Sequence, residues 1–591
     1  MLDFYTSFYY ALFVFYGGVY TTMATIQARK SRGRKYWYIV ESRRINGKPR
    51  PIMLAYLGKV DDLLKRLNGL TEEIKLKSYS HGAVAALLQV ANELDICKTI
   101  NKYVNSKRSY TTKKPIRNNL TVGASLLLAA IGRACRPTSK ASWADWAKTT
   151  SLSYLLRISL NKIDSQHFWD LMDALPVESV EKIEEEIIQK IFQKYNLKTD
   201  TLFYDTTNFF TYIHTTNNRC NIAKRGRNKQ KRSDLRQVGL ALVVSKRDKL
   251  PLFHLTYEGN RHDSKIFSRI VKKVKVRLEK LGLSLEQHTL IFDRGNNSKA
   301  NFALLTKNDM HYVGALVPYQ HKQIVNESMR YLSKNNKESS YRTQQTIWGE
   351  KRTVVAFISD ALKASQLSWI YNSIDKIETS LRQLQQGIAK RKRDIKSIEA
   401  RVSEIIKKYE SYINYHIDKQ PNGKHQLNFS INKTMLEQTE NERGFRILIT
   451  NRHDWSSEEI IQSYHGQSQI ERSFRDLKNP YNLAVRPQYH WTDQKIKVHF
   501  FICVLGYLLT ALLKLKIKEA ANYDYESGAL IHELNSIRLA TLLEDTKTQG
   551  KMKAHYKLEE MSKTEQDLVA ALSLEYYHRK RPKISGFSVY N

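Results

Sequence analysis

Cysteine is scarce in this sequence, and the four cysteines, Cys97, Cys135, Cys220 and Cys503, lie far apart. No two of them have the CxxC spacing of a zinc knuckle, and four in 591 residues are too few for a disulfide framework. Scarce, scattered cysteine is typical of a reducing compartment. We therefore expect a cytoplasmic protein.

Glycine and proline are also scarce, at 24 and 11 residues, whereas 41% of the residues are hydrophobic and 10% are aromatic. These values exclude a collagen-like chain and a mainly disordered basic tail. A chain of 591 residues is long enough for several folded domains with real cores.

Acidic residues are outnumbered: 58 Asp and Glu face 96 Lys and Arg, which leaves a formal net charge of +38. A field of this size attracts polyanions and argues against an enzyme of neutral or acidic surface that acts on small molecules. Nucleic acid is the first partner to consider.

Long hydrophobic runs are missing as well. The apolar run at 500–513 is shorter than the roughly 20 residues that cross a bilayer, so it predicts a buried helix and no membrane partner. Residues 1–22 are rich in aromatics but carry a single charge, Asp3, which is unlike a secretory signal. We expect Met23 to be the working start and residues 1–22 to be an upstream extension; a membrane segment is the alternative.

Hydrophobic periodicity divides the rest of the chain. Two strand-like runs flank Asn46-Gly47, a pair suited to a two-residue turn, whereas later segments have helical periodicity until apolar runs of strand length begin near residue 200. We predict a basic β-hairpin module at 23–66, a helical DNA-binding region at 67–197, an α/β domain at 198–320 and 444–515, an insertion domain at 321–443 and a helical C-terminal region at 516–591.

The predicted insertion carries apolar residues at alternating three- and four-residue steps from Leu367 to Ile405. This is a heptad stripe, broken beside Gly387. It predicts one long kinked helix or an antiparallel helical hairpin, and an intermolecular coiled coil is a further alternative. Trp348, in the same insertion, is either a core residue or a platform for an unpaired base.

Two aspartates follow apolar runs that predict strands. Asp205 ends TLFYD and Asp293 ends LIFD, and ligand crevices of open α/β sheets form at such strand ends. An aspartate after a strand is also a common turn former, so either residue alone leaves both interpretations open.

The segment YHGQSQIERSFRDLK adds a third carboxylate. Tyr464, Gln467, Glu471 and Lys478 fall on one narrow face of a single predicted helix. Such a face suits a polyanion, although a solvated charged face is the alternative. Carboxylates are the hard oxygen ligands of Mg²⁺, and three of them are the minimum for two Mg²⁺ ions, for which Mn²⁺ can substitute.

These residues carry a resemblance. YDTTN, IFDRG and the Tyr, Gln, Glu, Lys spacing resemble the DDE transposases of bacterial insertion sequences, in the branch with a Tyr-Arg-Glu-Lys signature. Segments such as RPTSKASWADW, YEGNRHDSK and RPQYHWTDQK resemble that group too. The resemblance implies an RNase H-like catalytic domain interrupted by an insertion domain. It also implies a prokaryotic, nucleoid-associated protein.

The resemblance implies roles for individual residues. Asp205, Asp293 and Glu471 match the catalytic metal-binding triad, and Tyr464 and Lys478 match contacts to DNA ends. Gln467 stands where the signature has arginine, so we expect a phosphate contact to be either weakened or taken over by Arg472 or Arg475.

A basic loop supplies further candidates for contacts with the DNA backbone. These are Lys224, Arg225, Arg227, Lys229, Lys231, Arg232 and Arg236, with Asp234 among them.

The leading hypothesis is a cut-and-paste transposase that cleaves the ends of its element, bound at their terminal inverted repeats, and joins them to target DNA as a homodimer or larger assembly. The alternative is a decayed or repurposed transposase that only binds DNA, which the Gln467 departure keeps open.

Overall fold

A computed structural model of the chain describes residues 24–31, 34–45, 48–59, 75–104, 118–197, 199–228, 230–335, 337–390, 392–421, 423–485, 489–545 and 552–588. The predicted extension at 1–22 lies outside the described residues. The chain divides into two compact units, one formed by residues 1–78 and 539–559 and the other by residues 79–538 and 560–591.

The first unit is built from β-structure. Strands β1 (Ala24–Ser31), β2 (Arg34–Ile45) and β3 (Lys48–Gly58) form an antiparallel sheet in that order. Ile45 pairs with Lys48, which confirms the predicted hairpin, and β1 adds a third strand that was not predicted. Asn46 and Gly47 themselves are outside the described residues.

A second small sheet has the order β16-β15-β4, formed by β4 (Lys75–Ser80), β15 (Arg538–Asp545) and β16 (Met552–Leu558). The prediction of a helical C-terminal region at 516–591 is therefore incomplete, because the region also contains these two strands. It missed β15 and β16 because their alternation of apolar and charged residues is short and irregular.

The second unit begins with helices, as predicted. These are α2 (Gly82–Glu93), α3 (Ile96–Lys102), α5 (Val122–Cys135), α6 (Trp143–Lys148), α7 (Leu152–Leu156), α8 (Ser165–Asp173) and α9 (Val180–Tyr195). Helices α19 (Ser527–Ser536) and α20 (Lys563–Ala571) follow later in the chain.

Helix α18 (Asp493–Ala521) packs against α5, α2, α8 and α20. Among the described residues it is the one helix long and apolar enough to cross a membrane, yet 94% of its most apolar window is buried inside the protein. Burial against protein on this scale is the property of a core helix, which agrees with the prediction for residues 500–513.

The centre of this unit is an eight-stranded sheet of order β10-β11-β14-β9-β8-β5-β6-β7. Its strands are β5 (Thr201–Thr211), β6 (Arg236–Ser245), β7 (Pro251–Glu258), β8 (Thr289–Phe292), β9 (His311–Leu316), β10 (Ser340–Ile347), β11 (Glu350–Ile358) and β14 (Phe445–Thr450).

Five of these strands form the RNase H-like core. β5, β6 and β7 are antiparallel in succession, whereas β8 pairs in parallel with β5, and β9 pairs in parallel with β8. The spatial order β7-β6-β5-β8-β9 is the order 3-2-1-4-5 when the strands are numbered along the chain. The predicted α/β fold with an RNase H-like core is confirmed.

The two faces of β5 are covered by different helices. The ring of Tyr204 packs at 5.4 Å against Phe267 of α10 (Asp263–Lys280), whereas Phe209 packs at 5.3 Å against Phe500 of α18. Because side chains alternate along a strand, residues 203, 205, 207 and 209 share the face toward α18. Asp205 belongs to that face.

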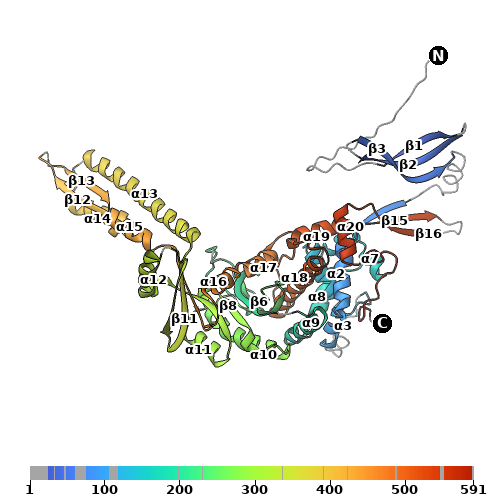
Figure 1. The fold of residues 1–591 in the computed structure, drawn as a ribbon, viewed down its shortest axis with the longest axis horizontal. Helices are drawn as coiled ribbons and strands as arrows, with labels where there is room; N and C mark the ends of the chain where they lie inside the picture. Colours follow the sequence, from blue (N-terminus) through green and yellow to red (C-terminus); the bar gives the residue numbers. More distant parts are fainter. Residues whose placement is uncertain are drawn as a thin grey trace, which may run out of the picture. The chain divides into compact units, whose positions relative to one another are not determined.

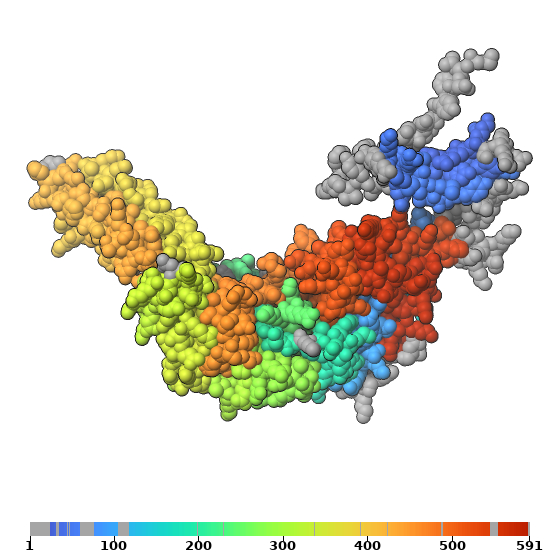
Figure 2. Space-filling view, in the orientation of Figure 1, coloured from blue at the N-terminus to red at the C-terminus, as the bar shows by residue number. Residues whose placement is uncertain are grey.

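The predicted insertion is partly built into this sheet. β10 and β11 extend it through β14, which pairs with β9. Residues 340–358, which we predicted to lie in a separate domain, are therefore part of the central sheet, with β10 as its edge strand. Figure 2 shows residues near 450–480, in orange, lying against the green residues of the earlier half of the domain.

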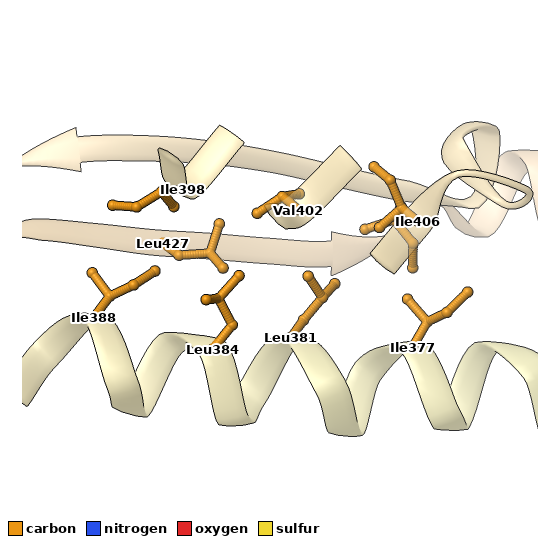
Figure 3. Close-up of a cluster of buried hydrophobic side chains, with 9 residues drawn as sticks. Ile377, Leu381, Leu384, Ile388, Ile398, Val402, Ile406 and Leu427 are labelled. Carbon is orange, nitrogen blue, oxygen red and sulfur yellow. The ribbon is translucent and has the colours of Figure 1, made fainter. Parts of the chain in front are cut away.

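The rest of the insertion has its own small core. Helix α13 (Asp360–Lys390) lies along α14 (Ile395–Ile406) and the hairpin of β12 (Ile413–Lys419) and β13 (His425–Ile431) (Figure 1). Ile388 lies near Ile398 and Ile377 near Ile406, so the two helices are antiparallel (Figure 3). The heptad stripe forms the predicted helical hairpin, and its apolar face is covered within the chain.

Candidate catalytic site

Parallel pairing of β5 and β8 places Asp205 and Asp293 at neighbouring positions. The register joins Tyr204 to Phe292, and each aspartate is the next residue. Neighbouring strands are about 4.8 Å apart. The prediction that Asp205 ends its strand is wrong, because β5 continues to Thr211 through its pairing with β6. The pairing of β5 with β8 nevertheless ends at Tyr204 and Phe292. Beyond that pair, the side of β5 toward Asp293 is not covered by β8.

Both aspartates are anchored locally. Oδ1 of Asp205 accepts a hydrogen bond from the backbone N–H of Thr206 at 2.7 Å, and Oδ1 of Asp293 accepts one from Arg294 at 2.7 Å. Asp205 is half-buried and Asp293 is exposed. The carboxylates therefore lie at the margin of the core, where a charged ligand has access from water.

The helix predicted to carry Tyr464, Gln467, Glu471 and Lys478 is divided. Helix α16 (Ser457–His465) ends and α17 (Ser468–Lys478) begins around Gly466 and Gln467, which keep right-handed helical backbone angles. A capping box between Ser456 and Glu459 fixes the start of α16. The single continuous helix of our prediction is wrong, although the chain keeps nearly the same direction.

Gly466 lets this segment approach the sheet. A Cβ added there would lie 2.7 Å from a ring carbon of Phe203 on β5, a distance that real Cβ atoms do not tolerate. The backbone therefore rests directly on the ring. Since Phe203 shares its strand face with Asp205, this contact brings α16 and α17 to the face that carries the carboxylate.

Tyr464 reaches the second aspartate. Its hydroxyl donates a hydrogen bond to Oδ1 of Asp293 at 3.3 Å, and the residue is only 6% exposed. Burial, reinforced by the charge of Asp293, raises the pKa of Tyr464. The phenol is thus a protonated donor to the carboxylate.

Lys478 reaches the strand beyond the first aspartate. Its Nζ donates to the hydroxyl of Thr207 and lies 5.4 Å from the ring centroid of Phe209. Glu471, two helical turns earlier on α17, is exposed and lies on the same side of the helix as Lys478. Gly466 and Lys478 thus lie on either side of Glu471 in the sequence. Their partners on β5, Phe203 and Thr207, lie on either side of Asp205.

Comparison with known proteins identifies the family. The family profile described as "Transposase DDE domain" matches residues 197–509, which is more than half of the chain. The chain belongs to this transposase family. The profile "IS1634 family transposase, N-terminal domain" matches residues 24–81, which places the transposase among those of insertion sequences.

A solved structure, "Cryo-EM structure of piggyBac transposase synaptic complex with hairpin DNA", is similar to the transposase at 11% sequence identity and a TM-score of 0.38, covering 77% of this chain and 79% of that one. No curated protein matches the sequence.

The donor set of the transposase suits Mg²⁺ by its chemistry, because Asp205, Asp293 and Glu471 offer only carboxylate oxygens. The hydrogen bonds that Asp293 accepts from Arg294 and Tyr464 both go to Oδ1, so Oδ2 is the oxygen that would remain for a cation. In the part of the chain that the structure describes, no three His, Cys, Asp or Glu side chains are grouped closely enough to hold a metal ion. The fold therefore gives the two aspartates neighbouring positions, but it does not bring Glu471, on the helix that packs on β5, into one cluster with them.

The polar residues around Glu471 differ in accessibility. Gln467 is the residue before α17 and is half-buried. Arg472 and Arg475 are both exposed, and a guanidinium nitrogen of Arg472 lies 4.0 Å from the carboxylate of Glu526. A pair at this distance in water is weak, so both arginines are accessible to a phosphate.

The basic loop of the transposase is only partly available for DNA. Arg232 forms a two-pronged bond with Asp234 at 2.7 and 2.6 Å. The guanidinium of Arg236 is bound to the backbone oxygens of Asn217 and Thr215. We predicted that Arg236 contacts DNA. These bonds conflict with that prediction, because they give the Arg236 side chain a structural role. The remaining basic residues of the loop that the structure describes are exposed: Lys224, Arg225, Arg227 and Lys231. Lys229 lies outside the described residues.

Trp348 is half-buried. Its ring lies 4.7 Å from that of Phe302, and the guanidinium of buried Arg352 lies 5.7 Å from it. These packing contacts favour the core residue over the base platform as its interpretation.

Sequence reasoning missed two partners of the site. Thr207 binds Lys478, and Phe203 contacts Gly466. The signal was present, because the two-residue period of a strand places both on the face of Asp205. It also missed the exposed aromatics Tyr212, Tyr489 and Trp491, which lie in loops, where no periodicity marks them.

Proposed function

We propose that the transposase cleaves DNA at the ends of its own element and joins those ends to target DNA, with Asp205, Asp293 and Glu471 holding two Mg²⁺ ions. The observation that supports this proposal is the register of β5 and β8, which gives Asp205 and Asp293 neighbouring positions, together with the packing on β5 of α17, which carries Glu471. When bound, a pair of such ions activates the attacking oxygen and stabilises the leaving oxygen at phosphorus.

Two reactions follow from one arrangement. In cleavage, an oxygen of water bonds to phosphorus, the bond from phosphorus to the 3′ oxygen breaks, and the departing oxygen takes a proton to become a 3′-hydroxyl. In joining, that hydroxyl attacks a phosphorus of target DNA, and the target's own 3′ oxygen leaves. Both are in-line displacements of the same kind, so one site serves both.

The residues around the triad have supporting roles in this proposal. Tyr464 orients Asp293 through its hydrogen bond, and Lys478, Arg472 and Arg475 neutralise phosphates near the scissile bond. Gln467 can offer only an amide to a phosphate, so the adjacent arginines supply the missing positive charge.

DNA binding is assigned to two basic surfaces. The loop containing Lys224, Arg225, Arg227 and Lys231 contacts the backbone of the DNA. The sheet of β1–β3, which carries the exposed Arg29, Lys30 and Lys35, recognises the terminal inverted repeats. Because two element ends must be joined in one reaction, we expect a dimer or larger assembly on DNA, acting in a prokaryotic cytoplasm.

The test is to replace Asp293 by Asn and compare it with Asp309→Asn. Asp309 is an exposed aspartate just before β9. Because β8 and β9 are parallel, it lies at the opposite end of the strands from Asp293. Asp293→Asn should abolish cleavage of DNA carrying the terminal repeats in Mg²⁺ while leaving salt-sensitive DNA binding intact, and Asp309→Asn should retain both.

Two outcomes would count against the proposal. Undiminished cleavage by Asp293→Asn would exclude the triad. DNA binding by the unchanged protein without cleavage in either Mg²⁺ or Mn²⁺ would favour a protein that only binds DNA.

A further inference from the structure

A basic pocket of about 580 Å³ lies between the loop after β5 and the start of α18, apart from the carboxylates. Four cationic side chains line it, those of Lys224, Arg261, Lys265 and Lys497, together with the acidic Glu258 and Asp493. Of these residues, Lys224 also belongs to the basic loop.

The two acidic residues do not neutralise the pocket. Glu258 pairs with Arg261 at 3.7 Å. Asp493 uses Oδ1 to accept hydrogen bonds from the backbone N–H groups of Asn221 and Ile222, at 2.7 and 3.0 Å. Lys224, Lys265 and Lys497 form no ion pair with any residue in the described part of the chain. Three such ammonium groups around one hollow fit a phosphate.

Exposed aromatic side chains lie on the two chain segments, 212–224 and 489–497, that also contribute residues to the pocket lining. Tyr212 and Tyr489 are 48% and 63% exposed, and their ring centroids are 5.5 Å apart. The exposed guanidinium of Arg219 lies 5.3 Å from the ring centroid of Trp491, which is 37% exposed. We call Tyr212, Arg219, Tyr489 and Trp491 the aromatic ledge.

The ledge and the pocket are fastened together. Asn217 donates from its side chain to the backbone oxygen of Trp491 at 3.2 Å, and Asp493 holds the backbone of Asn221 and Ile222. Arg236 fixes the same loop from β6 by its bonds to Thr215 and Asn217. The ligand would therefore meet a preformed surface, which reduces the entropy lost on binding.

We propose that the ledge and the pocket together bind an unpaired strand of DNA, with its bases stacked on the tyrosines and its phosphates in the pocket. An aromatic face reaches a base only when that base has left the duplex stack, whereas a cationic groove serves any backbone. The combination of the two on one surface is what selects a single strand. The inference rests on the proposed function, because it supposes DNA as the ligand.

The first experiment measures binding of the full chain, without metal, to a short single strand containing 2-aminopurine and to a duplex of the same sequence. The double variant Tyr212→Leu/Tyr489→Leu should bind the single strand about 10-fold or more weakly and lose the fluorescence quenching that stacking causes. Tyr212→Phe/Tyr489→Phe should retain both, because phenylalanine keeps the ring. Tyr576→Leu, at a tyrosine that is 69% exposed elsewhere, is the control for loss of an exposed ring.

The second experiment tests the pocket. Lys265→Gln and Lys497→Gln should each lower single-strand affinity and reduce the slope of log affinity against log salt by about 0.7. Lys272→Gln removes an exposed lysine from α10, two turns beyond Lys265 and outside the pocket, and should change the slope less.

The outcomes separate this inference from the proposed function. Single-strand binding that is insensitive to both tyrosines, or equal losses on single strand and duplex, would overturn the inference even if Mg²⁺-dependent cleavage is present. Tyrosine-dependent binding in a chain that lacks such cleavage would support the inference and count against the proposed function alone.

Discussion

The hydroxyl of Tyr464 and Oδ1 of Asp293 are 3.3 Å apart, and this hydrogen bond ties α16 to the end of β8. The phenol is buried and its pKa is raised, so it remains a donor at any physiological pH. A donor that holds one oxygen of a metal-binding carboxylate fixes the direction of the other. Tyr464, expected from the resemblance to contact DNA, contacts the carboxylate in the protein without DNA.

Replacement of Tyr464 by Phe removes this hydrogen bond and keeps the ring. We expect cleavage activity or apparent Mg²⁺ affinity to fall by about 10- to 100-fold, the usual cost of losing a group that orients a metal ligand. The measurement is cleavage of end DNA across a titration of Mg²⁺.

Tyr507→Phe is the matched control, because that hydroxyl is also buried and donates to Ser473 at 2.7 Å, away from the aspartates. It should cost about 1 kcal/mol of stability and leave the Mg²⁺ titration unchanged. Identical Mg²⁺ titrations for the two variants would show that Tyr464 only supports the fold.

The contact between Gly466 and Phe203 predicts that alanine destabilises the protein at Gly466, whereas it stabilises the protein at Gly387, which lacks such a contact. Gly466 has ordinary helical backbone angles, so alanine is opposed there only by the ring that its Cβ would meet at 2.7 Å. We expect Gly466→Ala to destabilise the protein by about 1–3 kcal/mol, as overpacking does.

Gly387→Ala is the comparison, because it lies inside α13 and its added Cβ would meet its nearest atom at 3.7 Å. It should stabilise its helix by about 0.5–1 kcal/mol. The free energy of unfolding of both variants, measured in urea, tests this difference. Equal effects of the two substitutions would show that the ring of Phe203 moves aside at little cost.

The strands of the core were predictable because each contains an apolar run, as expected for strands covered on both faces. The prediction ended β5 too early because polar residues 205–208 interrupt its apolar run. β10 and β11 were not, because β10 is an edge strand with polar residues such as Gln344 and Gln345 along it. A prediction that relies on apolar runs assigns such a polar strand to a loop or to another domain. Only the partner strand β14, nearly a hundred residues later in the chain, shows where they belong.

The site was predictable to a similar degree. Strand ends and helix spacing indicated three carboxylates, since these patterns depend on local geometry. The same spacing could not show whether Tyr464 points to solvent or to Asp293, because that depends on the close approach allowed by Gly466. Nor could it show that Arg236 is bound by loop carbonyls. The amino-acid sequence of a basic loop is the same whether an arginine side chain in it is exposed to solvent or bound to the backbone.

His81, before α2, predicts a loss of stability in acid. The ring is buried and accepts or donates one bond to Ser151 at 2.8 Å, and burial, with a smaller effect of His578, lowers its pKa to about 4. The unfolded chain takes up a proton near pH 6.5, but the folded protein does so only near 4. This contribution to stability is complete above pH 6.5 and is lost as the pH falls toward 4.

The expected loss at His81 is on the order of 2 kcal/mol between pH 7 and pH 5. His81→Gln should show a smaller decrease in the free energy of unfolding over this interval than the unchanged protein, as measured by urea unfolding at both pH values. The exposed His214→Gln serves as control. A decrease of the same size in all three proteins would assign the acid sensitivity to other groups.

Arg227 and Arg236 lie in one basic loop region but differ in what their side chains contact. Arg227 is exposed, whereas Arg236 donates to the backbone oxygens of Thr215 and Asn217 at 2.6 and 3.0 Å. Arg227→Gln should therefore weaken duplex binding and reduce its salt slope by about one, with unchanged stability. Arg236→Gln removes the same charge but should also destabilise the protein by about 2 kcal/mol, because two backbone oxygens lose a charged donor.

Salt-dependent binding and urea unfolding, measured on both variants, separate the two roles. Equal stability of the variants would show that the loop holds its shape without Arg236.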